Sequence, residues 1–244
     1  MIKPLIWKEW HEQRWKLFFG TAMLAFFTGS LLAARLSTNR EIVVVVWILG
    51  GLVLSLYSAM GVFAPEITNG TKTFLSSKPI QSWKIFLGKL FFGWLNFAVP
   101  MLICSAALAT VTLLHPADSV FELKYIAKGT FLAVCMGTAF YSMTCCFAPR
   151  KSSEAMVGFT GLMVFFAFIL HIMITDLLIV LPATRDSMGF SFFQELTLYI
   201  SPAFLLSLMG PIDFKMHPSF FIAEQAIIFI ITILIGLRKW QRSI

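Results

Sequence analysis

Residues 85–114 read IFLGKLFFGWLNFAVPMLICSAALATVTLL, and Lys89 is the single charged residue in this stretch. A helix needs roughly 20 apolar residues to cross about 30 Å of hydrocarbon. Because lipid offers no hydrogen-bond partner to an open backbone, a chain that crosses it must form helices or a closed barrel. The stretch therefore predicts a membrane-spanning helix whose first turns, with Lys89, project beyond the membrane.

Five further apolar blocks flank this one along the chain. Two of them precede it and three follow it. The blocks cover residues 17–34, 42–64, 125–147, 155–181 and 219–237. We therefore expect an all-α integral membrane protein with six transmembrane helices, folded as a single transmembrane domain over residues 1–244.

The composition and the placement of charge agree with this fold class. The chain is 58% hydrophobic, and 13% of its residues are Asp, Glu, Lys or Arg, whereas a soluble domain has about 25%. The net charge of +7 comes from basic residues at the block edges, where they anchor helices rather than bind nucleic acid. Cytosolic termini place 13 basic residues inside and 6 outside, which predicts a multi-pass protein of a prokaryotic cell membrane with both termini cytosolic.

The segment before the first block, residues 1–16, predicts an amphipathic helix that lies in the membrane interface. On a helix Trp7 and Trp10 share one face, while Lys8 and Glu12 lie on the other at i, i+4 spacing. Indoles suit headgroup depth and charges suit water. The segment is either a plain anchor or an elbow helix that also touches a cytosolic partner.

The loop after the second block, residues 65–84, begins PEITNGTKTFLSSKP. Glu66 suits the positive end of a short helix, and Pro79 ends one element and begins the next. A solvated connector does not need Phe74 and Leu75. An exposed apolar pair beside basic residues indicates a docking surface.

These two segments resemble the type-2 (ABC-2-like) permease subunits of ATP-binding-cassette (ABC) transporters. Such permeases often open with a Trp-Lys-Glu elbow, and Trp7, Lys8 and Glu9 stand there in this chain. Their first cytosolic loop carries an acid, Gly-Thr, Leu, Pro and a later Lys. The corresponding residues here are Glu66, Gly70, Thr71, Leu75, Pro79 and Lys89.

The resemblance implies that the 65–84 loop is a coupling helix seated in a groove of a separate cytosolic ATPase. Gly70 would permit a close backbone approach, and Phe74 with Leu75 would fill the groove. The chain has no phosphate-binding loop, because Gly88-Lys89 lacks the remaining residues of GxxxxGK[ST]. It is therefore not expected to be an enzyme by itself or to hold a cofactor. ATP and Mg would belong to two ATPase copies, paired with two permease copies as a homodimer or a related heterodimer.

The segment between the last two blocks, residues 182–218, is expected outside the membrane. Its stretch 195–211 is too short to span and too apolar to float in water, and Pro202 interrupts it. The resembled family carries short re-entrant helices here, and irregular backbone at membrane depth survives only when protein covers it. An amphipathic external cap is the alternative.

Three ionisable residues inside the fifth and sixth blocks are candidates for a translocation path: His171, Asp176 and Glu224. Charges in a membrane are costly and are functional candidates by default. Structural alternatives stay open, because Glu224 lies near a helix N-terminus, Asp176 near an interface, and His171 in a core. Asn96 is expected to tie helices together. No metal site is expected.

The reading that unites these features is the transmembrane subunit of an ATP-driven ABC exporter. A separate ATPase would close on ATP, and the loop would carry that motion to the spans and drive substrate efflux. The alternative is a membrane-embedded binding or sensory scaffold without transport. A secondary transporter is less favoured, because ionisable residues within the spans are few.

Overall fold

The computed structural model describes residues 3–33, 40–68, 81–114, 123–150, 153–180 and 218–242. Throughout these ranges the chain is helical and forms no strand. The six predicted apolar blocks fall on six separate long helices, one block on each helix. The elements are α1 (Lys3–Ala33), α2 (Arg40–Thr68), α4 (Ser82–Leu114), α5 (Leu123–Phe147), the short 3₁₀ helix η1 (Ala148–Arg150), α6 (Glu154–Val180) and α9 (Pro218–Arg242).

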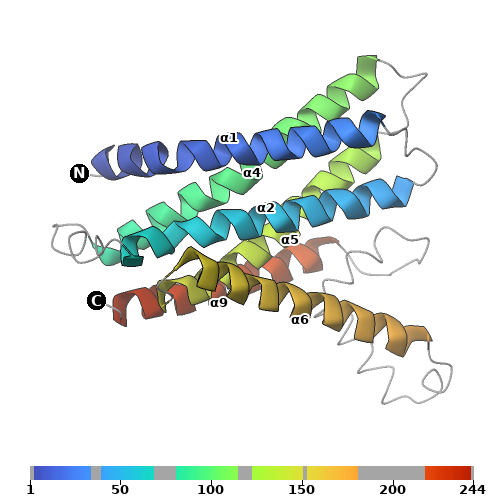
Figure 1. Cartoon of the computed structure of the whole chain (residues 1–244). Coiled ribbons are helices and arrows are strands. Elements are labelled where there is room, and N and C mark those ends of the chain that lie inside the picture. The colour runs from blue at the N-terminus through green and yellow to red at the C-terminus, as the bar shows by residue number, and fades with distance from the viewer. Residues whose placement is uncertain are drawn as a thin grey trace.

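The long helices form a bundle in which successive helices along the chain run in opposite directions (Figure 1). The two chain ends consequently lie at the same end of the bundle, which we call the terminal end. The end of α2 and the start of α4 lie there too, so this end gathers the flanks of the 69–80 segment.

Among the described residues, three helices are long and apolar enough to cross a membrane. The qualifying stretches are Trp47–Ala64, Ser82–Leu114 and Gly129–Phe147. The last of these lies in α5, and the shorter apolar stretch Glu154–Ala167 lies in α6. The 33 residues of α4 are about 50 Å long, which exceeds the hydrocarbon thickness of about 30 Å.

Small residues let α2 and α5 pack closely at the centre of the bundle. A Cβ atom added to Gly51 would lie 3.2 Å from the Cβ of Ala133, and one added to Gly137 would lie 3.5 Å from the carbonyl oxygen of Gly51. Close helix approach through Gly and Ala is typical of helix packing in membranes, where van der Waals contact replaces the hydrophobic effect.

Interhelical hydrogen bonds inside the bundle satisfy polar side chains that carry no charge. The Trp94 indole donates to Thr138 Oγ1 at 2.9 Å, and the Tyr141 hydroxyl donates to the Leu90 carbonyl at 2.8 Å. Both bonds join α4 to α5. A third bond, from Thr232 Oγ1 to Ser142 Oγ at 2.8 Å, joins α9 to α5.

Helix α1 presents polar and small side chains to the bundle and aromatic ones to the outside. Glu9, Gln13 and Gly20 are buried, whereas Trp10 and Phe26 are 52% and 78% exposed. The same arrangement extends along the helix in the exposed residues Trp7, Trp15, Phe18, Phe19 and Met23. Such a helix is stable only in an apolar surrounding, because in water it would expose its large apolar side chains.

The structure differs from the sequence prediction at the start of α1. The helix continues without a break through residues 16 and 17, where we expected an interfacial elbow to end and a span to begin. The reason lies in its charges: Lys8 and Lys16 contact carboxylates of α2 and α6 rather than lying only in water. The N-terminal segment is therefore packed along the bundle.

The end of α2 also differs from its prediction. The helix continues to Thr68, so Pro65 and Glu66 belong to α2 and do not begin a separate loop helix. A proline inside a helix removes the N–H that would donate to the carbonyl four residues earlier, here that of Gly61. Gln13 of α1 supplies a replacement donor, since its Nε2 donates to the Gly61 carbonyl at 3.4 Å.

Candidate functional site

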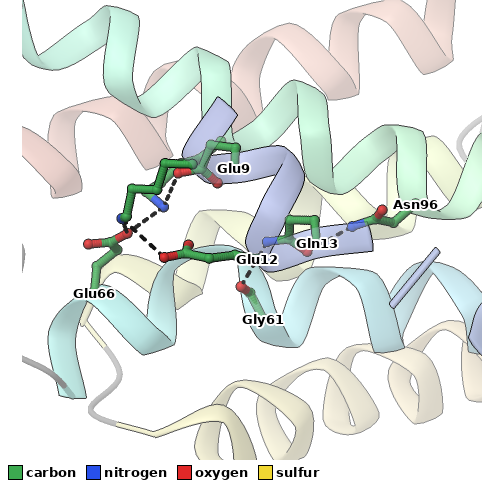
Figure 2. Close-up of polar contacts among 8 residues, drawn as sticks. Glu9, Glu12, Gln13, Gly61, Glu66 and Asn96 are labelled. Atoms are coloured by element: carbon green, nitrogen blue, oxygen red, sulfur yellow. Dashed lines mark hydrogen bonds and ion pairs between the residues drawn. The ribbon is translucent and has the colours of Figure 1, made fainter. Parts of the chain in front are cut away.

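A network of charged side chains joins α1, α2 and α4 at the terminal end of the bundle (Figure 2). At its centre, Lys89 Nζ donates to Oε1 of Glu9 at 2.7 Å and lies 2.7 Å from Oε1 of Glu66. All three side chains are at most 2% exposed. Each comes from a different helix, so one ammonium group holds three helices together.

Lys8 adds a second ammonium group at the edge of this cluster. Its Nζ donates to Glu66 Oε1 at 2.6 Å and lies 3.5 Å from Glu12 Oε1. Glu66 Oε1 thus sits between the ammonium groups of Lys8 and Lys89. Lys8 and Glu12 are partly exposed, so this edge connects the buried charges with solvent. We call Lys8, Glu9, Glu12, Glu66 and Lys89 the charge cluster.

A layer of amides lies beside the charge cluster, deeper along α1 (Figure 2). Asn96 Nδ2 of α4 donates to Gln13 Oε1 at 2.7 Å, while Gln13 Nε2 donates to the Gly61 carbonyl. The prediction that Asn96 ties helices together is confirmed by this contact. One Gln side chain therefore links α4 to the carbonyl that Pro65 leaves without its helical donor.

Burial and neighbouring charges shift the pKa values of two members of the cluster, Glu9 and Lys8. Burial raises the pKa of the Glu9 carboxyl, and the nearby charge of Lys89 offsets only part of that rise. For Lys8, burial lowers the pKa, but the hydrogen bond and the negative charge of Glu66 outweigh it, and the net pKa is raised. Lys8 therefore stays charged over the physiological range.

Oxygen atoms of Glu9, Glu12 and Glu66 lie within 4.8 Å of one another, close enough to share a cation. The ammonium group of Lys89 already supplies that positive charge, since it contacts both buried carboxylates. Two lysines within the same cluster make it a poor site for a divalent ion, because like charges repel strongly where water is excluded. The arrangement suits mechanical linkage and proton exchange.

A second ion pair ties α1 to α6 further along the bundle. Lys16 Nζ lies 3.5 Å from Glu154 Oε1, and Glu154 opens α6. The Lys16 side chain also passes over Gly61, where an added Cβ would overlap its ammonium group. Because Gly61 has no side chain, Lys16 can pass over it and reach Glu154 of α6.

The residues predicted from the elbow motif separate into two groups. Lys8 and Glu9 lie in the charge cluster, whereas Trp7 and Trp10 face outward. Glu66, predicted to meet an ATPase, is buried at the end of α2 and paired with two lysines. It therefore holds helices together rather than offering its carboxylate to another protein.

The remaining predicted coupling residues, Gly70, Thr71, Phe74, Leu75 and Pro79, lie outside the described residues, as does the re-entrant candidate 195–211. His171 and Asp176 belong to α6, and Glu224 belongs to α9, but their side chains are likewise not described. Helix α6 packs mainly on α2 and α5, and α9 packs mainly on α5. The sharing of one depth by Asp176 and Glu224 therefore stays a prediction.

Sequence reasoning missed the central role of Lys89 and the part played by Gln13. The signal for Lys89 was present, because a lone charge in a long apolar helix must find a partner. The partners themselves could not be predicted, since Glu9 and Glu66 lie 80 and 23 positions away. Comparison with known proteins adds no family: no family profile matches the chain, and no curated protein matches it.

Proposed function

We propose that this chain is the transmembrane subunit of an ATP-driven exporter, of the type-2 ABC permease kind. The observation that carries the proposal is the charge cluster, which links α1 to both helices that flank residues 69–80. Glu66 precedes that segment on α2, and Lys89 follows it on α4. Force applied to the segment passes through these ion pairs into α1.

In this proposal residues 69–80 are the coupling segment, and a cytosolic ATPase binds it. Phe74 and Leu75 fill a groove of that ATPase, while Gly70 and Thr71 allow close approach and Pro79 begins the link to α4. The partner binds ATP and Mg, and two ATPase copies act on two permease copies.

The proposed topology has six membrane spans with both termini cytosolic, in a prokaryotic cell membrane. The shared terminal end of the bundle and the outward-facing aromatic side chains of α1 support it. Re-entrant helices within 182–218 complete the outer side, and His171, Asp176 and Glu224 line the path there. Substrate then leaves between two permease halves that rock against each other.

The test is co-expression with the candidate ATPase, purification in detergent and reconstitution into vesicles. Phe74→Glu or Leu75→Glu should abolish permease-dependent stimulation of ATP hydrolysis while the chain still inserts. Val120→Glu, which makes the same kind of change in the 115–122 connection, is the matched control and should leave stimulation intact. Unchanged stimulation in both loop variants refutes the coupling assignment. A stable complex whose ATPase drives no transport, or no ATPase partner at all, favours the scaffold alternative.

A further inference from the structure

The charge cluster leaves one buried oxygen atom without a partner. Glu9 is fully buried, its Oε1 accepts from Lys89, and no hydrogen-bond partner lies near its Oε2 among the described residues. An ionised carboxylate oxygen that has lost its water and gained no donor is costly, because the low-dielectric surroundings do not stabilise its charge. The cost disappears when that oxygen carries a proton.

We propose that Glu9 Oε2 is a proton-binding site, at which solvent protons bind reversibly without breaking the hydrogen bond from Lys89 to Glu9 Oε1 or the ion pairs of Glu66. The proton adds to Oε2, and the charge of Glu9 changes from −1 to 0. Oε1 still accepts from Lys89, which keeps its own protons and its contact with Glu66. This site is a property of the chain itself and does not depend on an ATPase partner.

The neighbours of Glu9 explain why the proton binds there. The charged or titratable groups that face it among the described residues are Lys8 and Glu12 of α1, Glu66 of α2, Lys89 of α4 and Tyr141 of α5. Glu66 contacts two ammonium groups, and Glu12 is half-exposed, so water stabilises its charge. Glu9 shares the Lys89 ammonium group with Glu66 and is fully buried, which makes it the least stabilised of the three carboxylates.

The route to solvent runs over the exposed edge of the cluster. An oxygen of Glu12 lies within 4.8 Å of one on Glu9, and its side chain is 45% exposed. The exposed carboxylate of Glu12 therefore marks the side of the cluster that lies nearest to solvent. No metal is needed, since Lys89 already fills the position that a shared cation would take.

The direction of the pH effect follows from burial, which raises the pKa of Glu9 in the folded protein. Between the unfolded value, about 4.3, and the folded value, the folded chain binds more protons than the unfolded chain. The stabilising effect of this proton is therefore complete at low pH and is lost as pH rises through the folded pKa. Above that pKa Glu9 pairs with Lys89 through Oε1, but the folded protein bears the cost of an ionised Oε2 that has no donor among the described residues.

The experiment is pH-difference infrared spectroscopy of the purified full chain in detergent, in H₂O and D₂O. At pH about 6 an ordinary glutamate is almost wholly ionised. As pH is raised, the wild-type chain should keep a protonated-carboxyl C=O band, with a D₂O shift, to higher pH than an ordinary glutamate does. Glu9→Gln should remove the band, and Glu154→Gln, a control at an exposed glutamate outside the charge cluster, should retain it.

Thermal unfolding provides a second measurement, because a melting temperature can still be measured when a variant is less stable than the wild type. Glu9→Gln mimics the protonated side chain. The melting temperature of the wild type and of Glu154→Gln should fall as pH rises, and this fall should be absent in Glu9→Gln. The proposal is overturned if every carboxyl band of the wild type titrates in the range of an ordinary glutamate, if the raised band persists in Glu9→Gln, or if the pH dependence of melting is unchanged in Glu9→Gln.

Discussion

At the scale of single residues, Lys89 shows how a charge is kept inside an apolar helix. Its ammonium group is 2% exposed and contacts two carboxylates from two other helices. Removing both charges of a buried pair can be nearly neutral, but removing one partner leaves the other charge buried and unpaired. The stability of the lysine and of its carboxylates is therefore interdependent, and a single substitution at Lys89 should reveal this as a loss of stability.

Replacing Lys89 with Met should destabilise the folded chain by about 3–5 kcal/mol, because Glu9 loses its ammonium partner inside the bundle. Lys84→Met is the control: Lys84 is exposed and lies 5.4 Å from the centre of the Trp83 ring, an interaction worth about 0.5–1 kcal/mol. Denaturant unfolding in mixed micelles, followed by circular dichroism, measures both. Equal losses in the two variants contradict the buried-pair account.

The amide layer allows a sharper test of one contact. Gln13→Leu should cost about 1–3 kcal/mol, since the Gly61 carbonyl and Asn96 both lose a buried partner. Pro65→Ala restores the N–H that reaches Gly61 within α2. The cost of Gln13→Leu should therefore be smaller in the Pro65→Ala background, and a double-mutant cycle measures the difference. Strict additivity would show that Gln13 does not replace the missing donor.

At the scale of helices, close approach depends on glycines at a few crossing points. Gly93 of α4 faces α2 and α5, and an added Cβ there would overlap the Tyr141 hydroxyl and the Val62 side chain. The Tyr141 hydroxyl also donates to the Leu90 carbonyl, and the Ser58 hydroxyl donates to the Gly93 carbonyl. One small residue thus allows three helices to share hydrogen bonds.

Gly93→Ala should destabilise the chain by about 1–3 kcal/mol, because the helices must move apart and the bond from Tyr141 to Leu90 is strained. Gly29→Ala is the matched control within α1, where an added Cβ meets nothing within 4 Å among the described residues. There the gain in helix propensity, about 0.5–1 kcal/mol, should appear instead. Opposite shifts in melting temperature are expected, and shifts of the same sign contradict the packing account.

At the scale of the whole molecule, the bundle has an apolar core with a few buried charged and amide side chains, and it also carries many large apolar side chains on its outside. Trp15 on α1 is 59% exposed, whereas Trp240 on α9 is buried against the Phe63 ring, with the ring centres 5.4 Å apart. Other outward-facing apolar residues of α6 and α9 are Phe159, Phe166, Leu170, Ile230 and Leu234. This distribution suits lipid as the surrounding solvent.

Tryptophan fluorescence tests this distribution directly. In vesicles made with lipids brominated on the acyl chain near the glycerol, a variant that keeps only Trp15 should be strongly quenched. A variant that keeps only Trp240, with the other tryptophans changed to Phe, should be quenched little because neighbouring helices cover its indole. The reverse order would place α1 inside an assembly and α9 at the lipid.

The helices were predictable because their signal is local. Long apolar blocks fix where a helix can cross lipid, so residues 42–64 and 125–147 were each found within the helix that contains them. The continuity of α1 was not predictable, since Lys8 and Lys16 look solvent-exposed until the carboxylates of other helices are placed beside them. The helix end at Thr68 was missed because a proline normally marks a boundary.

The charge cluster was predictable in part. Glu9 and Lys8 were selected by motif and Glu66 by its place in the loop, but their pairing with Lys89 depends on which helices are neighbours. A periodic sequence pattern indicates which face of a helix is polar or apolar. It does not indicate which other helix packs against that face. Gln13 was invisible for the same reason, because its role depends on a carbonyl of α2 and an amide of α4.

The bond between Glu9 and Lys89 has a consequence for biosynthesis. The two residues are separated by 80 positions. At about 5–20 residues per second, the ribosome makes that length in roughly 4–16 s. During this interval the first helix has emerged with a carboxylate and without its counter-charge from Lys89. It should therefore leave the translocation channel late, together with α4, rather than ahead of it.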